Sequence, residues 1–194
     1  MTKVKTGNPA FPVPICVVGT IVKGKINYAT YRSFGLLSPR PKTYVYIGSQ
    51  GSRYTNIGIK ETGYFSVNIP SVDQMQKTDY VGLVSGHHMD KSSVFKSFFG
   101  STDTAPLIEE CHVNMLCKLI RTANDIPDRD IFFGEVLETY VDEACLKNGV
   151  LDFTRINPLL FTVNGPGNAS YWKLGEVVGD AYKDGKALIK PDKK

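Results

Sequence analysis

The stretch KTYVYIGSQGSRYT, residues 42–55, leads an apolar strand directly into a corner of small, polar residues. Residues 44–47 are aromatic or β-branched and predict a β-strand. GSQGS (48–52) and Arg53 then offer backbone N–H groups, hydroxyls and one positive charge. Such a corner is either an ordinary turn or an anion-binding loop, because loop N–H groups and helix N-termini commonly hold phosphates.

The residues after this corner predict a short helix and another strand. YTNIGIKET (54–62) favours a helix, although Gly58 interrupts it. Gly63 stands where a left-handed glycine commonly ends a helix. A helix that begins at Tyr54 presents unpaired N–H groups and about half a positive charge to the corner. YFSVNI (64–69) predicts the next strand.

Strand patterns outnumber helix patterns in the rest of the chain. A β-hairpin is expected over residues 14–31, with Gly24 at its turn. The other expected elements are strands at 111–120 and 130–146, a short helix capped by Ser71 with Gln74 in a capping box, a helical turn at 91–98, and short strands in a loop-rich final third. Many short strands closed by turns predict a mainly β fold, a barrel.

Composition favours one domain. The 194 residues are 42% hydrophobic, which suits a single domain over residues 1–194 with a core from about 12 to 180 and polar, frayed ends at 1–9 and 190–194. The net charge of +4 comes from scattered lysines. A nucleic-acid binder usually carries a clustered basic stripe, so no nucleic-acid partner is expected, whereas an anionic small ligand is compatible.

The N-terminal region has no long apolar segment. ICVVGTIV (15–22) is too short to span a bilayer, and no signal-peptide pattern precedes it. The sequence therefore predicts a cytoplasmic protein without a membrane partner.

The four cysteines form no CxxC pair. In ECHVNMLCKLI (110–120), Cys111 and Cys117 alternate with polar residues, so both thiols are expected on the apolar face of one strand. Cysteines of the core are the simpler interpretation of Cys16, Cys111, Cys117 and Cys145, and a metal or redox pair is the alternative.

The adjacent His87 and His88 lack further ligands at usable spacing, so no metal site is predicted.

Three segments end apolar stretches with residues that can offer backbone N–H groups. They are residues 26–31, 47–55 and 84–91. Arg53 and Lys91 could each add a charge-assisted contact to an anion. Each loop taken alone is as compatible with a simple turn.

These segments carry a resemblance to a known family. KINYATY (25–31), TYVYIGSQGSRYTNIGIKETGYFSVNIPS (43–71), TDYVGLVSGHHMDK (78–91) and PLIEECHVNMLCKL (106–119) resemble the flavin reductase-like family, in particular its flavoredoxin-type branch. The resemblance runs from about Pro12 to Gly179. It implies an FMN-binding split β-barrel of Greek-key type, usually a homodimer with flavin near the subunit interface.

The resemblance also implies a set of cofactor-binding residues. One segment would run along the flavin ring through backbone contacts, the corner would hold the ring edge and phosphate, and a third loop would close the site. Family members often carry a histidine–threonine pair where this chain has Arg53, Tyr54 and Thr55, and Arg53 could replace the histidine. Tyr171 could cover the flavin of a neighbouring subunit or simply pack with Trp172. The predicted cofactor-binding residues are Asn27, Tyr28, Ala29, Thr30, Ser49, Gln50, Arg53, Tyr54, Thr55, Ser85, Gly86, Lys91 and Tyr171.

Two functional classes follow from this resemblance, and a third stays open. The first is an NAD(P)H-dependent FMN reductase or related oxidoreductase. The second is a non-catalytic FMN electron carrier between redox protein partners. The third is a barrel without a working flavin site. The cofactor would carry most of the chemistry, and the sequence singles out no catalytic residue. The absence of a dinucleotide-binding GxGxxG does not exclude an enzyme, because the resemblance implies that nicotinamide stacks directly on flavin.

Overall fold

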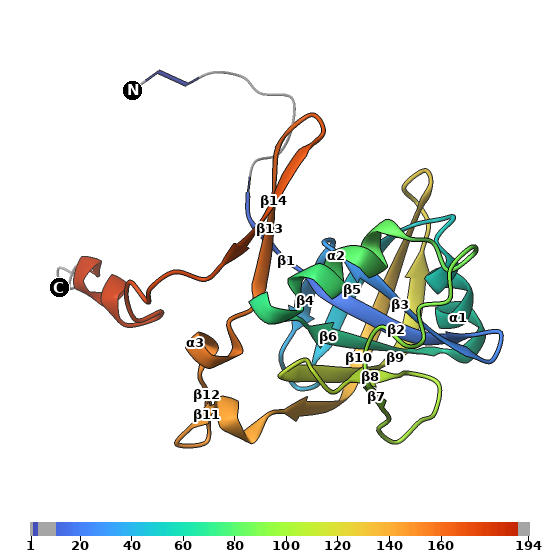
Figure 1. Ribbon diagram of the computed structural model, residues 1–194. Coiled ribbons are helices and arrows are strands. Elements are labelled where there is room, and N and C mark those ends of the chain that lie inside the picture. Colours follow the sequence, from blue (N-terminus) through green and yellow to red (C-terminus); the bar gives the residue numbers. More distant parts are fainter. Residues whose placement is uncertain (1, 4–10, 190–194) are drawn as a thin grey trace.

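Figure 1 shows the computed structural model of the chain, which describes residues 2–3 and 11–189. The ends that the sequence predicts to be frayed lie almost entirely outside the described residues. Seven antiparallel strands form the main sheet in the order β3-β2-β6-β9-β10-β5-β4. Their bounds are β2 Cys16–Val22, β3 Lys25–Tyr31, β4 Phe34–Ser38, β5 Tyr44–Gln50, β6 Tyr64–Ile69, β9 Val113–Ala123 and β10 Arg129–Val141.

The sheet curls until β3 lies against β5. Across that join the buried Tyr31 hydroxyl hydrogen-bonds the Ser49 hydroxyl at 3.2 Å. The long strand β10 has two irregularities in its pairing with β9, which allow it to bend. Gly134, at one of them, faces the ring of Phe65, and a Cβ there would lie only 2.5 Å from that ring. The predicted mainly β barrel is therefore confirmed.

The predicted hairpin is the pair of strands β2 and β3. Lys23 and Gly24 both have positive φ, 50° and 75°, at its two-residue turn. Positive φ at both central residues matches the right-handed twist of the flanking strands, and glycine adopts it without steric cost.

The predicted short helix is α1, Tyr54–Thr62, which lies across β2. It ends at Gly63 with a left-handed φ of 72°, as expected. Gly58 faces the strand, where a Cβ would lie 2.3 Å from the carbonyl oxygen of Ile21. The glycine that weakens the helical pattern is therefore needed for the helix to lie this close to the sheet.

The predicted capping box begins the second helix. The Ser71 hydroxyl accepts from the Asp73 N–H, and the Gln74 side-chain oxygen accepts from the Ser71 N–H at 2.8 Å. A 3₁₀ turn at Val72–Gln74 leads into α2, Met75–Leu83, which packs on β3. The remaining short elements are β7 Ser97–Phe98, β8 Leu107–Ile108, β11 Leu146–Lys147, β12 Val150–Leu151, α3 Phe153–Ile156 and 3₁₀ turns at Glu143–Cys145 and Asp184–Leu188.

The buried apolar side chains form two clusters. The larger cluster fills the barrel, and the smaller one lies outside it, under α2 and the loop that follows. All four cysteines are buried and unpaired, and burial raises the pKa of the Cys16, Cys111 and Cys117 thiols. Buried thiols with a raised pKa are unreactive, so these cysteines are structural residues of the core.

Several local predictions were wrong. Cys111 does not share a face with Cys117, because it precedes β9 and joins the outer cluster. The sequence predicts both Phe132 and Phe133 in the core. Phe132 is buried there, but Phe133 is only half-buried and lies under the Arg121 guanidinium outside the barrel. Residues 91–98 form turns and strand β7 rather than a helical turn, and the strand predicted to continue to residue 146 stops at Val141.

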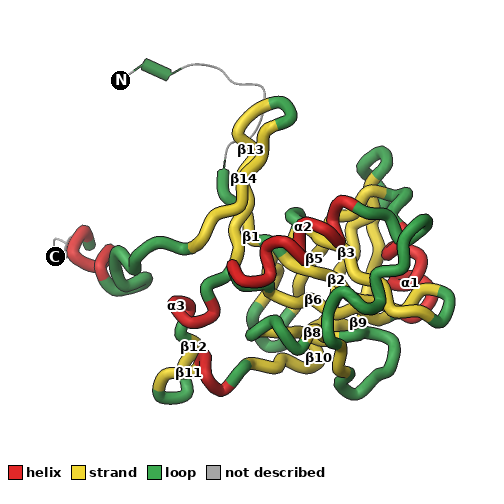
Figure 2. Tube along the Cα trace, viewed as in Figure 1, coloured by secondary structure: helices red, strands yellow, loops and turns green. Residues whose placement is uncertain are grey.

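A second sheet extends from the barrel as an arm. Strands β1 (Val13–Pro14), β13 (Leu159–Gly165) and β14 (Asn168–Lys173) form it. Figure 2 shows this hairpin standing apart from the barrel, followed by a loop that leads away from both. None of the helices in the described residues is long and apolar enough to cross a membrane.

Candidate functional site

The corner between β5 and α1 is organised by one buried side chain, Asn56. Its amide nitrogen donates to the carbonyl oxygens of Gln50 (2.9 Å) and Gly51 (3.3 Å) and to the Asp130 carboxylate (3.0 Å). Its amide oxygen accepts from the Ser49 hydroxyl at 2.6 Å. Because these bonds tie the corner to the sheet from beneath, its shape is fixed before any ligand binds.

The N-terminus of α1 is left without a side-chain cap. Arg53 occupies the N-cap position with an extended backbone, and neither it nor an acidic residue of the first turn compensates the helix N–H groups. This helix end lines a small cavity of about 220 Å³, together with the predicted site residues Ala29, Gln50, Tyr54, Thr55, Ser85, Gly86 and Lys91. Uncompensated N–H groups and the positive end of the helix dipole favour an anion there.

Lys91 adds a buried positive charge to the same cavity. Its side chain is only 3% exposed, and its Nζ donates to the carbonyl oxygens of Val81 (3.2 Å) and Val84 (3.3 Å) at the end of α2. No carboxylate of the described residues lies within ion-pair distance of it. Burial, and next the charge of Arg53, lower the pKa of Lys91 to about 8. A buried ammonium without a counter-ion beside a guanidinium favours binding of an anion.

Thr55 supplies a hydroxyl group to this cavity, and a hydrogen bond from Asn27 holds its side chain in place. The Asn27 amide donates to the Thr55 hydroxyl oxygen at 2.9 Å, and both side chains are buried. Asn27 itself lies behind the cavity wall. Tyr28 points the opposite way, where its hydroxyl bonds Ser97 at 2.7 Å and its ring packs on Phe95. Neither Asn27 nor Tyr28 lines the cavities described here, so any flavin contact of theirs is through the backbone or through Thr55.

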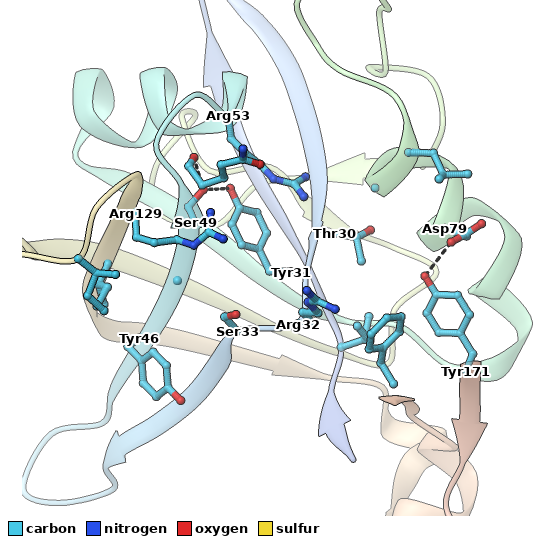
Figure 3. Close-up of a pocket in the computed structure, with 18 residues that line it drawn as sticks. Thr30, Tyr31, Arg32, Ser33, Tyr46, Ser49, Arg53, Asp79, Arg129 and Tyr171 are labelled. Carbon is cyan, nitrogen blue, oxygen red and sulfur yellow. Dashed lines mark hydrogen bonds between the residues drawn. The ribbon is translucent and has the colours of Figure 1, made fainter. Parts of the chain in front are cut away.

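A larger cavity of about 580 Å³ adjoins the small one. The two share Gln50, Arg53, Gly82 and Leu83. Figure 3 shows it between β3 and β5 on one side and α2 and β14 on the other. The predicted site residues that line it are Thr30, Ser49, Gln50, Arg53 and Tyr171.

Tyr171 lines the cavity of its own chain. Its hydroxyl donates to the Asp79 carboxylate at 2.9 Å, which joins the arm to α2 (Figure 3). Burial and this hydrogen bond raise the pKa of Tyr171, so the phenol stays protonated. Its neighbour Trp172 is half-exposed, and the indole N–H donates to the Thr162 hydroxyl at 2.7 Å.

Sequence reasoning missed a group of residues that line the larger cavity. Arg129 is the clearest example, because strand register places it opposite Gln50 although nothing local to residues 126–131 marks a site. The missed residues are Tyr31, Arg32, Ser33, Tyr46, Asp79 and Arg129. These residues come together only when the sheet closes and α2 packs on it, and no local pattern of a single sequence shows that.

The histidine pair stays outside both cavities. His87 and His88 are exposed, and the His87 ring meets the edge of Tyr54 at 4.8 Å. Within residues 2–3 and 11–189, no group of His, Cys, Asp or Glu side chains is arranged to hold a metal ion.

The chain matches a known protein family. Residues 8–165 match the family described as the flavin reductase like domain. The chain belongs to the flavin reductase-like family. The resemblance read from the sequence is therefore confirmed.

Solved structures of similar proteins agree with that assignment. A flavoredoxin from Methanosarcina acetivorans has a TM-score of 0.91 and is 38% identical, covering 97% of this chain and 100% of that chain. A flavoredoxin of Desulfovibrio vulgaris (Miyazaki F) has a TM-score of 0.85 and is 27% identical, covering 95% of this chain and 100% of that chain. A putative flavin reductase with a split barrel domain from Shewanella frigidimarina, 16% identical, has a TM-score of 0.76, with 88% and 86% of the two chains covered. The predicted split-barrel fold is confirmed.

The curated sequence relatives include proteins that match only part of this chain. An uncharacterized protein of Archaeoglobus fulgidus is 29% identical over 103 residues, which are 52% of this chain and 57% of that protein. The matched region thus spans little more than half the length of that relative.

Proposed function

We propose that this protein is an FMN-binding oxidoreductase whose flavin is reduced by NADH or NADPH. Membership of the flavin reductase-like family and the similarity to flavoredoxins support a flavin-binding, oxidoreductase-type protein. The single observation that carries the choice of ligand is Lys91, a buried cation without a carboxylate partner at an uncapped helix N-terminus.

The small cavity suits the phosphate of FMN. Lys91 and Arg53 supply positive charge, the first N–H groups of α1 supply donors, and Thr55 supplies a hydroxyl whose oxygen already accepts from Asn27. Because Asn27 occupies the oxygen, the hydroxyl hydrogen of Thr55 is left to donate to a ligand. A cavity of about 220 Å³ at one end of the site fits one terminal phosphate better than the longer diphosphate arm of FAD.

The larger cavity would hold the flavin ring. Thr30 of β3, Ser49 of β5 and Tyr171 of β14 line it, and Gln50 lies at the boundary shared with the small cavity. When bound, FMN supplies hydride and electron transfer chemistry. The residues of the chain bind and orient the cofactor, and the Asn56 network beneath the corner keeps their donors in place.

Reduction of the bound flavin tests this function. FMN-loaded protein would be mixed anaerobically with NADH or NADPH, and the loss of the oxidised-flavin absorbance would be followed in a stopped-flow instrument. The proposal expects at least one nucleotide to reduce the flavin without an added protein. If dithionite reduces the flavin while both nucleotides leave it oxidised, the protein is an electron carrier instead, and if no flavin binds, the barrel has another role.

A further inference from the structure

The larger cavity carries more positive charge than one phosphate requires. Arg32, Arg53 and Arg129 all line it, and Asp79 is the one acidic residue among its lining residues. Asp79 already accepts the Tyr171 hydroxyl. The site therefore has an excess of positive charge in a protein whose whole net charge is only +4.

These arginines lack the carboxylate partners that several lysines of the protein have. Lysines on the outer surface commonly form ion pairs, and among the described residues such pairs join Lys25, Lys42, Lys60, Lys77 and Lys96 to carboxylates. No carboxylate of the described residues lies within ion-pair distance of Arg32, Arg53 or Arg129. Three unpaired guanidinium groups around one hollow repel each other and create a strong positive potential there.

Arg32 is held so that its donors remain available. Its guanidinium carbon lies 5.4 Å from the centre of the Phe161 ring, and Phe161 in turn meets Tyr171 edge-on at 5.6 Å. A guanidinium over an aromatic face keeps its N–H groups in its own plane, where they can make the paired bonds that carboxylates and phosphates accept. The stacking fixes the side chain without using those donors.

Arg129 approaches the cavity from the opposite wall. It begins β10 beside Gln50 of β5, and the only hydrogen bond of its guanidinium within the described residues is a long one, 3.4 Å, to the carbonyl oxygen of Asp128. Gly48 lines the same cavity, and a Cβ there would lie 3.0 Å from the Ser33 side chain. Figure 3 shows Arg32, Arg53 and Arg129 arranged around this one hollow.

We infer that Arg32 and Arg129 form a second oxyanion subsite, which binds a phosphate or carboxylate group of the small molecule that exchanges electrons at the site. It is separate from the subsite of Lys91 and the α1 N-terminus, because neither Arg32 nor Arg129 lines the small cavity. The inference rests on the proposed function in one respect: with the FMN phosphate assigned to the small cavity, the flavin brings no second phosphate for Arg32 and Arg129 to bind.

Anion titration of the FMN-loaded protein tests this subsite directly. Pyrophosphate and citrate would be titrated separately by isothermal calorimetry, so that the two arms distinguish a phosphate-bearing ligand from a carboxylate-bearing one. At least one anion should bind, and Arg32→Gln and Arg129→Gln should each weaken that binding about tenfold, the loss expected from one charge-assisted contact. Both variants should retain FMN, because neither residue lines the small cavity that is assigned to its phosphate.

Arg121→Gln is the matched control. Arg121 lies 5.3 Å over the Phe133 ring, much as Arg32 lies over Phe161, but it lines neither cavity. Its removal should leave anion binding unchanged. Failure of both anions to bind the wild type at millimolar concentration, or equal loss in all three variants, would overturn the inference.

The flavin titration separates this inference from the proposed function. If the protein binds no FMN, the function fails, and pyrophosphate is then titrated into the flavin-free protein. Binding that still depends on Arg32 and Arg129 would keep the subsite, whereas binding that depends only on Lys91 would remove it.

Discussion

At the scale of single residues, Thr55 serves both the fold and the site. Its oxygen accepts from the buried Asn27 amide, so Thr55→Ala leaves a buried donor without a partner. We expect the free energy of unfolding to fall by about 1–3 kcal/mol and FMN affinity to fall as well. Thr55→Ser keeps the hydroxyl and should restore most of both losses.

Urea unfolding and FMN titration of the two variants check this prediction. A Thr55→Ala protein with wild-type stability would show that the Asn27 bond contributes nothing. A stability loss with unchanged FMN affinity would restrict Thr55 to a structural role.

The lowered pKa of Lys91 predicts that FMN binding depends on pH. Its pKa in the flavin-free protein is lowered to about 8, and a bound phosphate should raise it again. The ammonium is therefore present below about pH 8 and lost above it, so FMN affinity should fall as pH rises through that value, by up to about tenfold per unit. Below about pH 6 the phosphate of FMN loses its second charge, which should weaken binding again.

Fluorescence titrations of FMN and riboflavin across this pH range provide the measurement. Riboflavin lacks the phosphate, so its affinity should fall neither above about pH 8 nor below about pH 6. Lys91→Met should flatten the FMN curve above pH 8, whereas Lys96→Met should not, because Lys96 is an exposed lysine paired with Glu109. If the FMN affinity of Lys91→Met still falls above about pH 8, a group other than Lys91 causes the pH dependence.

At the scale of elements, the close approach of α1 to β2 depends on Gly58. Gly58→Ala should favour the isolated helix by about 1 kcal/mol, but the new Cβ would clash with the Ile21 carbonyl. We expect a net destabilisation of about 1–3 kcal/mol, because overpacking forces the helix away from the strand. Chemical denaturation measures it, and Glu61→Ala, at an exposed position of the same helix, should change stability little.

A Gly58→Ala protein as stable as wild type would mean that α1 tolerates a shift from the sheet. In that case its N-terminus would also be free to move, and the fixed geometry of the phosphate cavity would be in doubt.

Elements that depend on local patterns were predictable. The β2–β3 hairpin, the capping box before α2 and the glycine that ends α1 each depend on residues within a few positions of one another. Cys111 was misplaced because strict alternation ignores where β9 begins, and Phe133 was misplaced because alternation, which puts it on the face opposite Phe132, was not applied to it. Arg32, Asp79 and Arg129 meet at the larger cavity only through closure of the sheet and packing of α2 on it, which no local pattern encodes.

At the scale of the whole molecule, we propose that the arm and tail pair with a second copy of the chain. Val177, Val178 and Tyr182 are 82%, 100% and 96% exposed, and the barrel of this chain does not cover them (Figure 1). Exposed apolar residues in one segment commonly mark a protein interface, and an obligate one buries more than about 2,000 Å².

Light scattering after size-exclusion chromatography tests the dimer at micromolar concentration. The wild type should have the mass of two chains, and Val177→Asp combined with Val178→Asp should shift it to one. Circular dichroism should show that the barrel of the variant is intact. A monomeric wild type would contradict this proposal and would also exclude Tyr171 as a cover for the flavin of a neighbouring subunit.

The central claim is that the corner after β5 and the buried Lys91 form a phosphate subsite for FMN. Titration of FMN and riboflavin into the flavin-free wild type and Lys91→Met tests it most directly. We predict that FMN binds the wild type and that Lys91→Met weakens FMN about ten- to a hundredfold, the loss of a hydrogen bond to a charged group, while riboflavin affinity is unchanged. Absence of FMN binding to the wild type, or an equal loss for both flavins in Lys91→Met, would contradict the account.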